Sequence, residues 1–188
     1  MKKGLAAFGG ILLLLIIIVM AGYNGLAGSR EDVASAAANV DTMLQRRSDL
    51  IPNLIDSVKS YAAHETAVFD AVLEARKELM EAQDMQQKAA ADSKLDAALG
   101  NMNVTLEAYP ELKSDTVYIG LMDELSGSEN RISTARHDYN EAVRLYNHKL
   151  VTLPGSLLGA VFGFEKADYF EADEMTAQVP DAGVLLAD

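Results

Sequence analysis

Histidine and carboxylate side chains are the groups in this sequence that could do chemistry, either as metal ligands or as acid–base groups. His64-Glu65 begins like the zinc-binding helix motif His-Glu-x-x-His, but Val68 stands where the second histidine would be. No histidine has a glutamate three residues before it, so the Glu-x-x-His motif of di-iron bundles is absent. His137 and His148 are eleven residues apart, roughly 16 Å along a helix, and cannot hold one ion. We therefore expect no metal and no cofactor.

One catalytic hypothesis remains, a hydrolase in which His64, Glu65 and Glu129 act as acid and base groups. Such a site needs a water-filled cavity and carboxylates with perturbed pKa values. The sequence offers no nucleophile elbow for Ser-His-Asp catalysis and no phosphate-binding loop. We rank this hypothesis last and expect a protein that is not an enzyme.

Charged and amide side chains also occupy positions that the helical pattern assigns to the core. Glu65, Glu129 and Arg136 each share a heptad line with apolar residues. Because a buried charge is unfavourable unless it is paired, we expect Glu65 to pair with Arg136 or Arg131. The expected role of this structural polar network is to fix helix register, and ligand binding is the alternative. Its predicted members are Glu65, Glu129, Asn130, Arg131, Arg136 and Asn140.

Apolar residues at heptad spacing predict the helices that position these groups. The expected helices cover residues 29–47, 50–79, 94–109 and 114–152, with a loop at 81–93. Ser48-Asp49 as a cap and Pro52 in a first helical turn predict a tight turn at residues 47–49. In the longest helix a stripe repeats every seven residues, which indicates one face packed against neighbours: Tyr118, Leu125, Ile132, Tyr139, Tyr146 and Leu153.

Arg46-Arg47 closes the first of these expected helices. A helix C-terminus favours cations, which accounts for the pair by itself. The alternative is a contact with acidic side chains across the first turn, or with a partner.

The N-terminal segment is apolar and free of charge over residues 5–21, and a helix of seventeen to eighteen such residues spans roughly 27 Å, just enough to cross a bilayer core. A cleaved signal peptide is the alternative, because Val19-Met20-Ala21 is a tolerable cleavage site. Lys2 and Lys3 favour a cytoplasmic N-terminus and an extracytoplasmic domain. The sequence thus predicts an all-α fold, an N-terminal transmembrane helix followed by an antiparallel up-and-down four-helix bundle with long, coiled-coil-like helices.

The expected organisation along the chain has five parts. They are a basic flank at 1–4, a transmembrane anchor at 5–22, a helical bundle at 23–155, an apolar segment at 156–170 and an acidic tail without fixed structure at 171–188. The apolar segment could cap the bundle end, touch the bilayer or join another subunit. Its candidate interface residues are Leu157, Leu158, Val161, Phe162, Phe164, Tyr169 and Phe170.

Composition excludes several classes of function. The formal net charge of −12 argues against nucleic acid, because phosphate binding needs a basic face. The same acidity argues against electrostatic docking along an anionic lipid surface. The absence of cysteine excludes disulfides, thiolate zinc sites and a lipoprotein cysteine.

Distinctive blocks follow one another between residues 23 and 170. They are YNGL (23–26), QRRSDLIPNLIDSVKSYAAHE (45–65), AYPELK (108–113), ELSGSENRISTARHDYNEAVRLYN (124–147), LPG (153–155) and FGF with YF (162–170). Together these blocks resemble the LemA family. The resemblance implies a bacterial, N-terminally anchored, antiparallel helical bundle, with no established enzymatic activity and no catalytic residue to transfer.

The expected function is therefore a scaffold or assembly role at a bacterial membrane through homo-oligomerisation. Its expected partners are the lipid bilayer and further copies of the chain, because tethering raises the effective concentration of weakly interacting surfaces. The alternative is a binding or sensor module that receives a peptide or small ligand and acts with a partner membrane protein.

Overall fold

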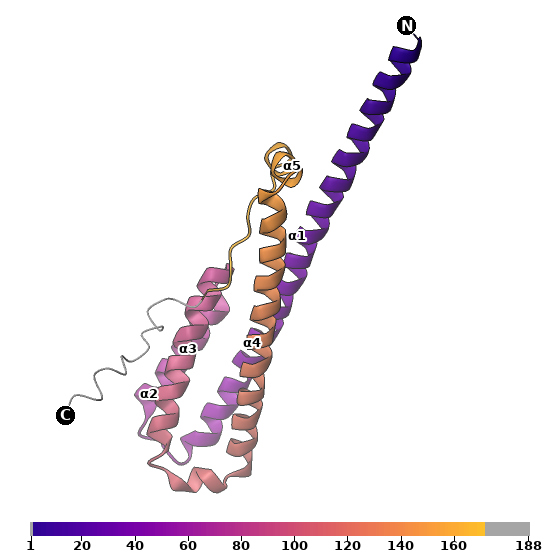
Figure 1. Ribbon diagram of the computed structural model, residues 1–188. Helices are drawn as coiled ribbons and strands as arrows, with labels where there is room; N and C mark the ends of the chain where they lie inside the picture. The colour runs from indigo at the N-terminus through magenta and orange to yellow at the C-terminus, as the bar shows by residue number, and fades with distance from the viewer. Residues whose placement is uncertain (1, 172–188) are drawn as a thin grey trace, which may run out of the picture. The chain divides into compact units, whose positions relative to one another are not determined.

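The computed structural model describes residues 2–171, with side chains from residue 8 onward. These residues form five α-helices, one 3-10 helix and no strand, which confirms the predicted all-α class (Figure 1). The elements are α1 (Lys2–Lys59), α2 (Thr66–Glu81), α3 (Met85–Leu106), η1 (Pro110–Ser114), α4 (Thr116–Val151) and α5 (Gly155–Phe162). The acidic tail expected at 171–188 lies outside the described residues, apart from Glu171.

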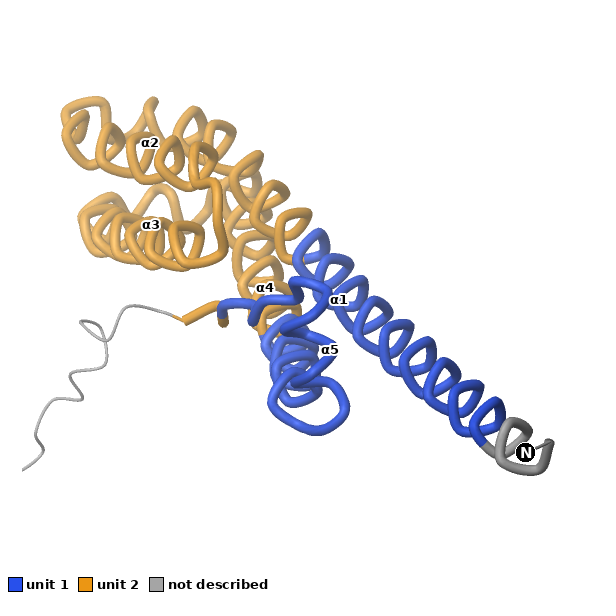
Figure 2. Tube along the Cα trace, turned by 90° about the horizontal axis from the view of Figure 1, so that it is seen from above, with its two compact units in different colours: residues 1–39, 137–168 blue, residues 40–136, 169–188 orange. Residues whose placement is uncertain are grey.

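The chain divides into two compact units, and α1 and α4 each contribute residues to both (Figure 2). Unit 1 comprises Met1–Asn39 and His137–Asp168, and unit 2 comprises Val40–Arg136 and Tyr169–Asp188. In unit 2, α2 packs against α3.

The predicted turn at residues 47–49 is wrong, because α1 continues as one helix to Lys59. Leu44, Arg47, Ile51 and Leu54 are all buried, at alternating spacings of three and four residues that run straight through the expected turn. This uninterrupted stripe outweighs the local cap signal of Ser48-Asp49, since most helical stability comes from packing of one face.

Pro52 is accommodated inside α1 by a side chain from α2. A proline in a helix interior leaves the carbonyl four residues earlier, here that of Ser48, without its amide donor. Arg76 of α2 supplies the missing donor, since its Nε lies 2.7 Å from the Ser48 carbonyl oxygen. The long-range bond therefore replaces the local one, and the helix passes through the proline.

The chain reverses at residues 60–65 and again at 82–84, so the loop expected at 81–93 is far shorter than predicted. The Asp84 side chain caps α3 by accepting a hydrogen bond from the Gln87 amide at 2.7 Å. The Ala-rich stretch that follows is helical and places Ala89 and Asp92 in the core of unit 2. The apolar residues expected to face inward from this helix, Leu95, Leu99, Met102 and Leu106, are buried.

In unit 1, the polar ends of side chains from α4 form hydrogen bonds with an irregular segment at residues 163–168. The hydroxyl groups of Tyr139 and Tyr146 donate to the carbonyl oxygens of Asp168 and Glu165, each at 2.8 Å. Asn147 donates to the carbonyl of Ala167 at 2.8 Å and accepts from its amide at 2.9 Å. Burial raises the pKa of both tyrosines, so both hydroxyl groups stay protonated as donors at neutral pH.

The seven-residue stripe of α4 ends before Leu153. Tyr146 is buried, but Leu153 is 76% exposed, because α4 ends at Val151 and the chain turns into α5. The prediction that Leu153 packs inward with the stripe is wrong for this reason.

Candidate functional site

Arg47 joins three helices of unit 2 through one guanidinium group. Its side chain comes from the interior of α1 and is 5% exposed. Nη1 lies 3.0 Å from Oδ1 of Asp92 in α3 and 3.1 Å from Oε2 of Glu129 in α4. Nη2 pairs with Oδ1 of Asp96, one turn further along α3. The planar fork of arginine suits such a multiple contact better than the point charge of lysine would.

Asp92 carries the second half of the arrangement. It is completely buried, and its Oδ2 pairs with Nη2 of Arg136 from α4. Burial lowers the pKa of Arg136, and the neighbouring charge of Arg47 lowers it further. Arginine nevertheless stays charged in proteins, so the carboxylate of Asp92 lies between two cations. We call Arg47, Asp92, Asp96, Glu129 and Arg136 the buried charge cluster.

An aromatic ring covers one side of this cluster. The Phe170 ring is buried, and its centroid lies 5.0 Å from the guanidinium carbon of Arg136. Such a cation–π contact attracts the arginine without needing a further carboxylate.

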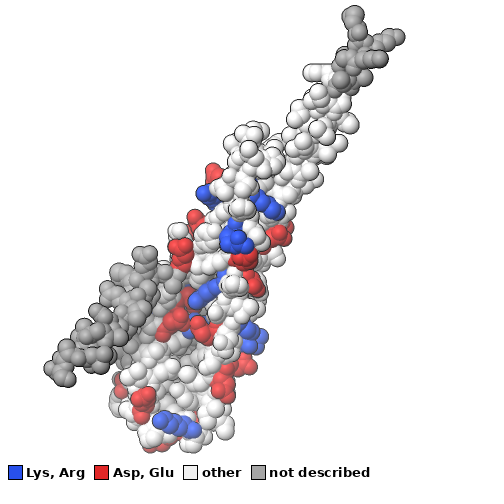
Figure 3. All heavy atoms as spheres, viewed as in Figure 1, with Lys and Arg blue, Asp and Glu red and all other residues white. Residues whose placement is uncertain are grey.

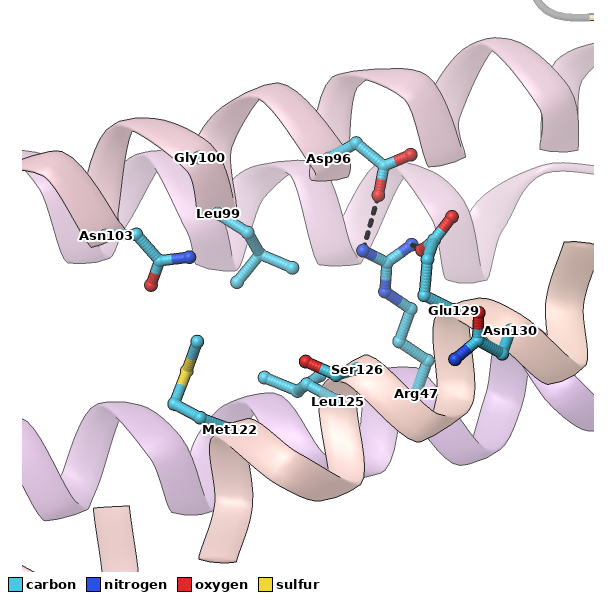
Figure 4. Close-up of a pocket in the computed structure, with 10 residues that line it drawn as sticks. All are labelled: Arg47, Asp96, Leu99, Gly100, Asn103, Met122, Leu125, Ser126, Glu129 and Asn130. Atoms are coloured by element: carbon cyan, nitrogen blue, oxygen red, sulfur yellow. Dashed lines mark hydrogen bonds and ion pairs between the residues drawn. The ribbon is translucent and has the colours of Figure 1, made fainter. Parts of the chain in front are cut away.

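A cavity of about 440 Å³ lies beside the cluster (Figure 4). Arg47, Asp96 and Glu129 form its charged end, and Leu99 and Met122 lie among its apolar walls. Its remaining lining residues are Gly100, Asn103, Leu125, Ser126 and Asn130. The cavity therefore combines apolar walls with hydrogen-bonding groups of positive and negative charge, a composition common to many small-molecule sites.

The structure places the predicted polar network in several locations rather than one. Glu65 immediately precedes α2 and accepts a hydrogen bond from the Tyr109 hydroxyl at 2.8 Å. Arg136, its expected partner, pairs with Asp92 instead. The reason is the continuity of α1, which moves the first reversal of the chain to residues 60–65 and takes Glu65 out of a helix interior.

The other predicted members are distributed around α4. Glu129 belongs to the buried charge cluster, and Asn130 lines the cavity. Arg131 is exposed and lies 3.8 Å from Glu124, which also pairs with Arg46 at 3.3 Å. Asn140 is half-buried in unit 1.

The candidate interface residues separate into two groups. Leu158 and Phe170 are buried within the chain, and Phe164 and Tyr169 are half-buried. Leu157, Val161 and Phe162 are exposed.

The sequence pattern does not single out Asp92, which it places in the expected loop. For Arg47 the preferred prediction, a cation at a helix end, is wrong, whereas the alternative of contact with acidic side chains is what the structure shows, although without the predicted turn. A usable signal was present, because Asp92 lies three residues before Leu95 and continues the inward line of α3. Arg47 lies likewise between Leu44 and Ile51 on the inward line of α1. When an acidic residue continues the buried heptad line of one helix and a basic residue continues that of another, the pattern predicts a buried ion pair.

The carboxylates of the cluster are engaged with arginines rather than grouped for a metal. Among the described residues, no set of three or more histidine and carboxylate side chains could hold a metal ion. The arrangement can tie helices together and can present a polar end to the adjoining cavity.

The N-terminal part of α1 has a different character. Residues 8–21, which we call the apolar arm, are exposed and carry no charge. Within the described chain, α1 is the one helix with a stretch long and apolar enough to cross a membrane, a test of length and composition that a signal sequence also passes.

Fold and site together define the class: an all-helical protein with an N-terminal helix able to span a bilayer and a helical unit tied by buried arginine–carboxylate pairs. A comparison with known protein families identifies the family within this class, because the sequence model of the LemA family matches residues 36–182. The chain belongs to the LemA family, as its ordered sequence blocks predicted.

Similar proteins carry two names. The chain is 31% identical over 175 residues to Magnetosome protein MamQ 2 of Paramagnetospirillum magneticum, an alignment that covers 79% of this chain and 64% of that protein. It is 29% identical to Magnetosome protein MamQ of Magnetospirillum gryphiswaldense, covering 85% of this chain and 68% of the relative. It is 22% identical to Protein LemA of Metamycoplasma hominis, covering 81% and 70%. The chain thus spans less than two thirds of the length of the first of these relatives.

Proposed function

We propose that this protein is a membrane-anchored helical scaffold that assembles with further copies of itself, and that it has no catalytic step. The observation that carries the proposal is the continuity of α1. One helix holds the exposed apolar arm and, further along, Arg47 of the buried charge cluster. Anchoring by the arm confines the chains to a surface, where weak contacts between them suffice for assembly.

The proposal includes a topology. Residues 40–136 are an antiparallel up-and-down four-helix bundle, a reading supported by the short connections at 60–65, 82–84 and 107–115. The N-terminus is cytoplasmic and the helical units are extracytoplasmic, as Lys2 and Lys3 favour.

Anchoring is tested by placing two charges in the arm. Leu13→Arg with Ile17→Arg puts arginines on one helix face, each costing about 2.5–3.5 kcal/mol near the middle of a membrane helix. We expect the full chain to float with lipid vesicles and the double variant to stay in the soluble fraction. The matched control, Leu145→Arg on the exposed face of α4, is expected to float. Equal flotation of all three proteins contradicts the anchor.

Assembly is tested by the mass of the full chain in nanodiscs large enough for several copies. A uniform multimer that the Leu13→Arg, Ile17→Arg variant fails to form supports the scaffold. A monomer at every lipid-to-protein ratio contradicts it.

The cavity favours a second candidate, a binding or sensor module that receives a peptide or small ligand and acts with a partner membrane protein. Members of the buried charge cluster form its charged end, and its lining residues come from α1, α3 and α4, so a ligand there contacts three helices. A photo-crosslinking amino acid at Asn103, which lines the cavity, is expected to yield an adduct in cells. The control position is Val104, its exposed neighbour in sequence that does not line the cavity. Adducts at both positions, or at neither, count against a specific site.

A further inference from the structure

α5 has two faces, and the outer one is apolar. Gly155, Leu158 and Gly159 are buried against the rest of unit 1. Leu157 and Val161, four residues apart on the opposite side, are 64% and 76% exposed. A short helix on a protein surface normally presents polar side chains to water. The outer face of α5, defined by Leu157 and Val161, therefore needs an apolar neighbour.

Contacts within unit 1 fix α5 against the part of α1 that directly follows the apolar arm. A Cδ atom of Leu158 occupies the space that a side chain at Gly22 would fill. The Tyr23 ring meets the ring of Phe162 edge-on at a centroid distance of 5.1 Å, and that of Phe164 at 5.6 Å. Met20, near the end of the arm, and Gly22 lie only about 3 Å apart in height along the helix axis. α5 thus lies at the level where the arm ends.

Charges are arranged to match a boundary at this level. No charged residue occurs between Lys149 and Glu165, and the arm and α5 carry no blue or red spheres in Figure 3. Lys149 directs its ammonium group away from this run, to the carbonyl of Gly25 at 3.3 Å and to the hydroxyl of Ser29. Tyr23, which is partly exposed, has the amphipathic ring that is enriched at membrane interfaces.

We propose that the outer face of α5 inserts into the lipid bilayer beside the apolar arm, as an interfacial helix that sets the membrane-proximal end of unit 1. This inference rests on the proposed anchoring by the arm. The occupant is lipid rather than a second copy of the chain, because two outward apolar side chains are far fewer than the roughly 20–30 residues a side of a stable subunit interface. Insertion is driven by apolar burial, so it needs no basic patch and is compatible with the acidic chain.

The absence of cysteine makes a direct depth measurement possible, because single cysteine variants carry a spin label at one position. Full-length Ile16→Cys, Val161→Cys and Val117→Cys proteins are labelled and placed in phosphatidylcholine nanodiscs. Ile16 reports on the arm, and Val161 reports on α5. Val117, an exposed apolar residue of unit 2, is the matched control. The measurement is relaxation of each label by oxygen, which concentrates in lipid, and by a water-soluble nickel chelate.

Labels at 16 and 161 are expected to respond to oxygen and to be shielded from nickel, and the label at 117 is expected to behave oppositely. If 16 is in lipid but 161 matches 117, the inference about α5 is overturned and the anchor stands. If 16 also matches 117, the anchor fails and the inference fails with it. If 161 is shielded from both agents and shows spin–spin broadening that unlabelled chain removes, α5 contacts a second copy and the inference is overturned.

A second variant tests the cause of insertion. With the label at Val161→Cys, Leu157→Glu is expected to move the label toward water, whereas Leu157→Met leaves its depth unchanged. Circular dichroism of each variant checks that the helices are retained. Equal depth in the two variants overturns the assignment of this face to lipid.

Discussion

Unit 1 and unit 2 use α4 in different ways. In unit 2, α4 supplies Glu129 and Arg136, which form ion pairs with side chains of other helices. In unit 1, α4 supplies Tyr146 and Asn147, which are neutral and bond to backbone atoms of the segment at 163–168. Apart from Lys149, which bonds to Gly25 and Ser29, α4 therefore changes from charged contacts up to Arg136 to neutral contacts after it.

The difference matters because the two kinds of contact fail differently. Loss of one neutral hydrogen bond typically costs about 0.5–1.5 kcal/mol, and an unpaired buried charge costs about 3–5 kcal/mol. A wrong helix register also separates buried ion pairs, at a high cost in free energy. A backbone segment held by neutral hydrogen-bond donors can shift at a lower cost. We therefore expect the helix register to be defined more strictly in unit 2. We expect local opening to need less free energy in unit 1.

Removing Asp92 should have the largest effect. Asp92→Ala leaves Arg47 and Arg136 close together without the carboxylate between them, and we expect a loss of about 3 kcal/mol in the free energy of unfolding. Urea unfolding of the full chain in detergent measures it. Asp96→Ala, which removes a carboxylate with a 40% exposed side chain, is the control and should cost about 1 kcal/mol or less. Equal losses contradict a special role for the buried carboxylate.

Arg76 should have the next largest effect, through Pro52. Arg76→Ala leaves the buried carbonyl of Ser48 without a donor, which we expect to cost about 2 kcal/mol. In a Pro52→Ala background the residue at 52 has its own amide for that carbonyl. The same Arg76→Ala change should then cost clearly less in the same unfolding assay. A loss that is independent of residue 52 means that Arg76 acts in another way.

The neutral contacts of unit 1 should give a smaller and more local effect. Asn147→Ala removes two hydrogen bonds to the Ala167 backbone, and we expect a loss of about 1 kcal/mol. Hydrogen exchange should report it as faster exchange at the Ala167 amide, with unit 2 unaffected. His148→Ala, an exposed neighbour, serves as control. Uniformly faster exchange in both units would remove the proposed difference between them.

Asp115 should give the smallest effect, visible only in acid. Hydrogen bonds from the Tyr118 amide and then from the Tyr61 hydroxyl hold the pKa of Asp115 below its ordinary value of 3.8. A lowered folded-state pKa stabilises the fold above 3.8, and this contribution is lost as the pH falls through the lower folded value. Asp115→Asn should therefore lose less stability than the parent chain between neutral pH and acid. Parallel pH profiles would show that the contribution is absent.

The helical class and the family were predictable, because they depend on features repeated along the chain. Heptad stripes and ordered blocks give many consistent signals, and Leu95, Leu99 and Met102 are buried as the stripe predicted. The positions of helix ends depend on a few local residues, and here those residues predicted a helix end that the structure does not contain. Pro52 is a reliable sign of a helix start unless a distant donor such as Arg76 compensates, and no local pattern reveals such a donor.

The candidate site was harder to predict than the fold for a related reason. Pairing of Arg47 with Asp92 depends on which helices are neighbours and in which register, and both follow from the position of the first reversal. The turn predicted at 47–49 places Glu65 in a helix, and the loop predicted at 81–93 separately removes Asp92 from the core. These two errors together pair Arg136 with the wrong carboxylate.

The composition of unit 1 has a consequence for the order of folding. Its contact between Gly25 and Lys149 joins residues 124 positions apart, whereas Arg47 and Asp92 of unit 2 are 45 apart. At synthesis rates of about 5–20 residues per second, Gly25 emerges roughly 6–25 s before Lys149. Unit 1 therefore cannot be completed until Lys149 and the segment at 163–168 have been made, after residues 40–136 of unit 2. The surface of residues 22–29 must therefore stay available through the synthesis of nearly the whole of unit 2.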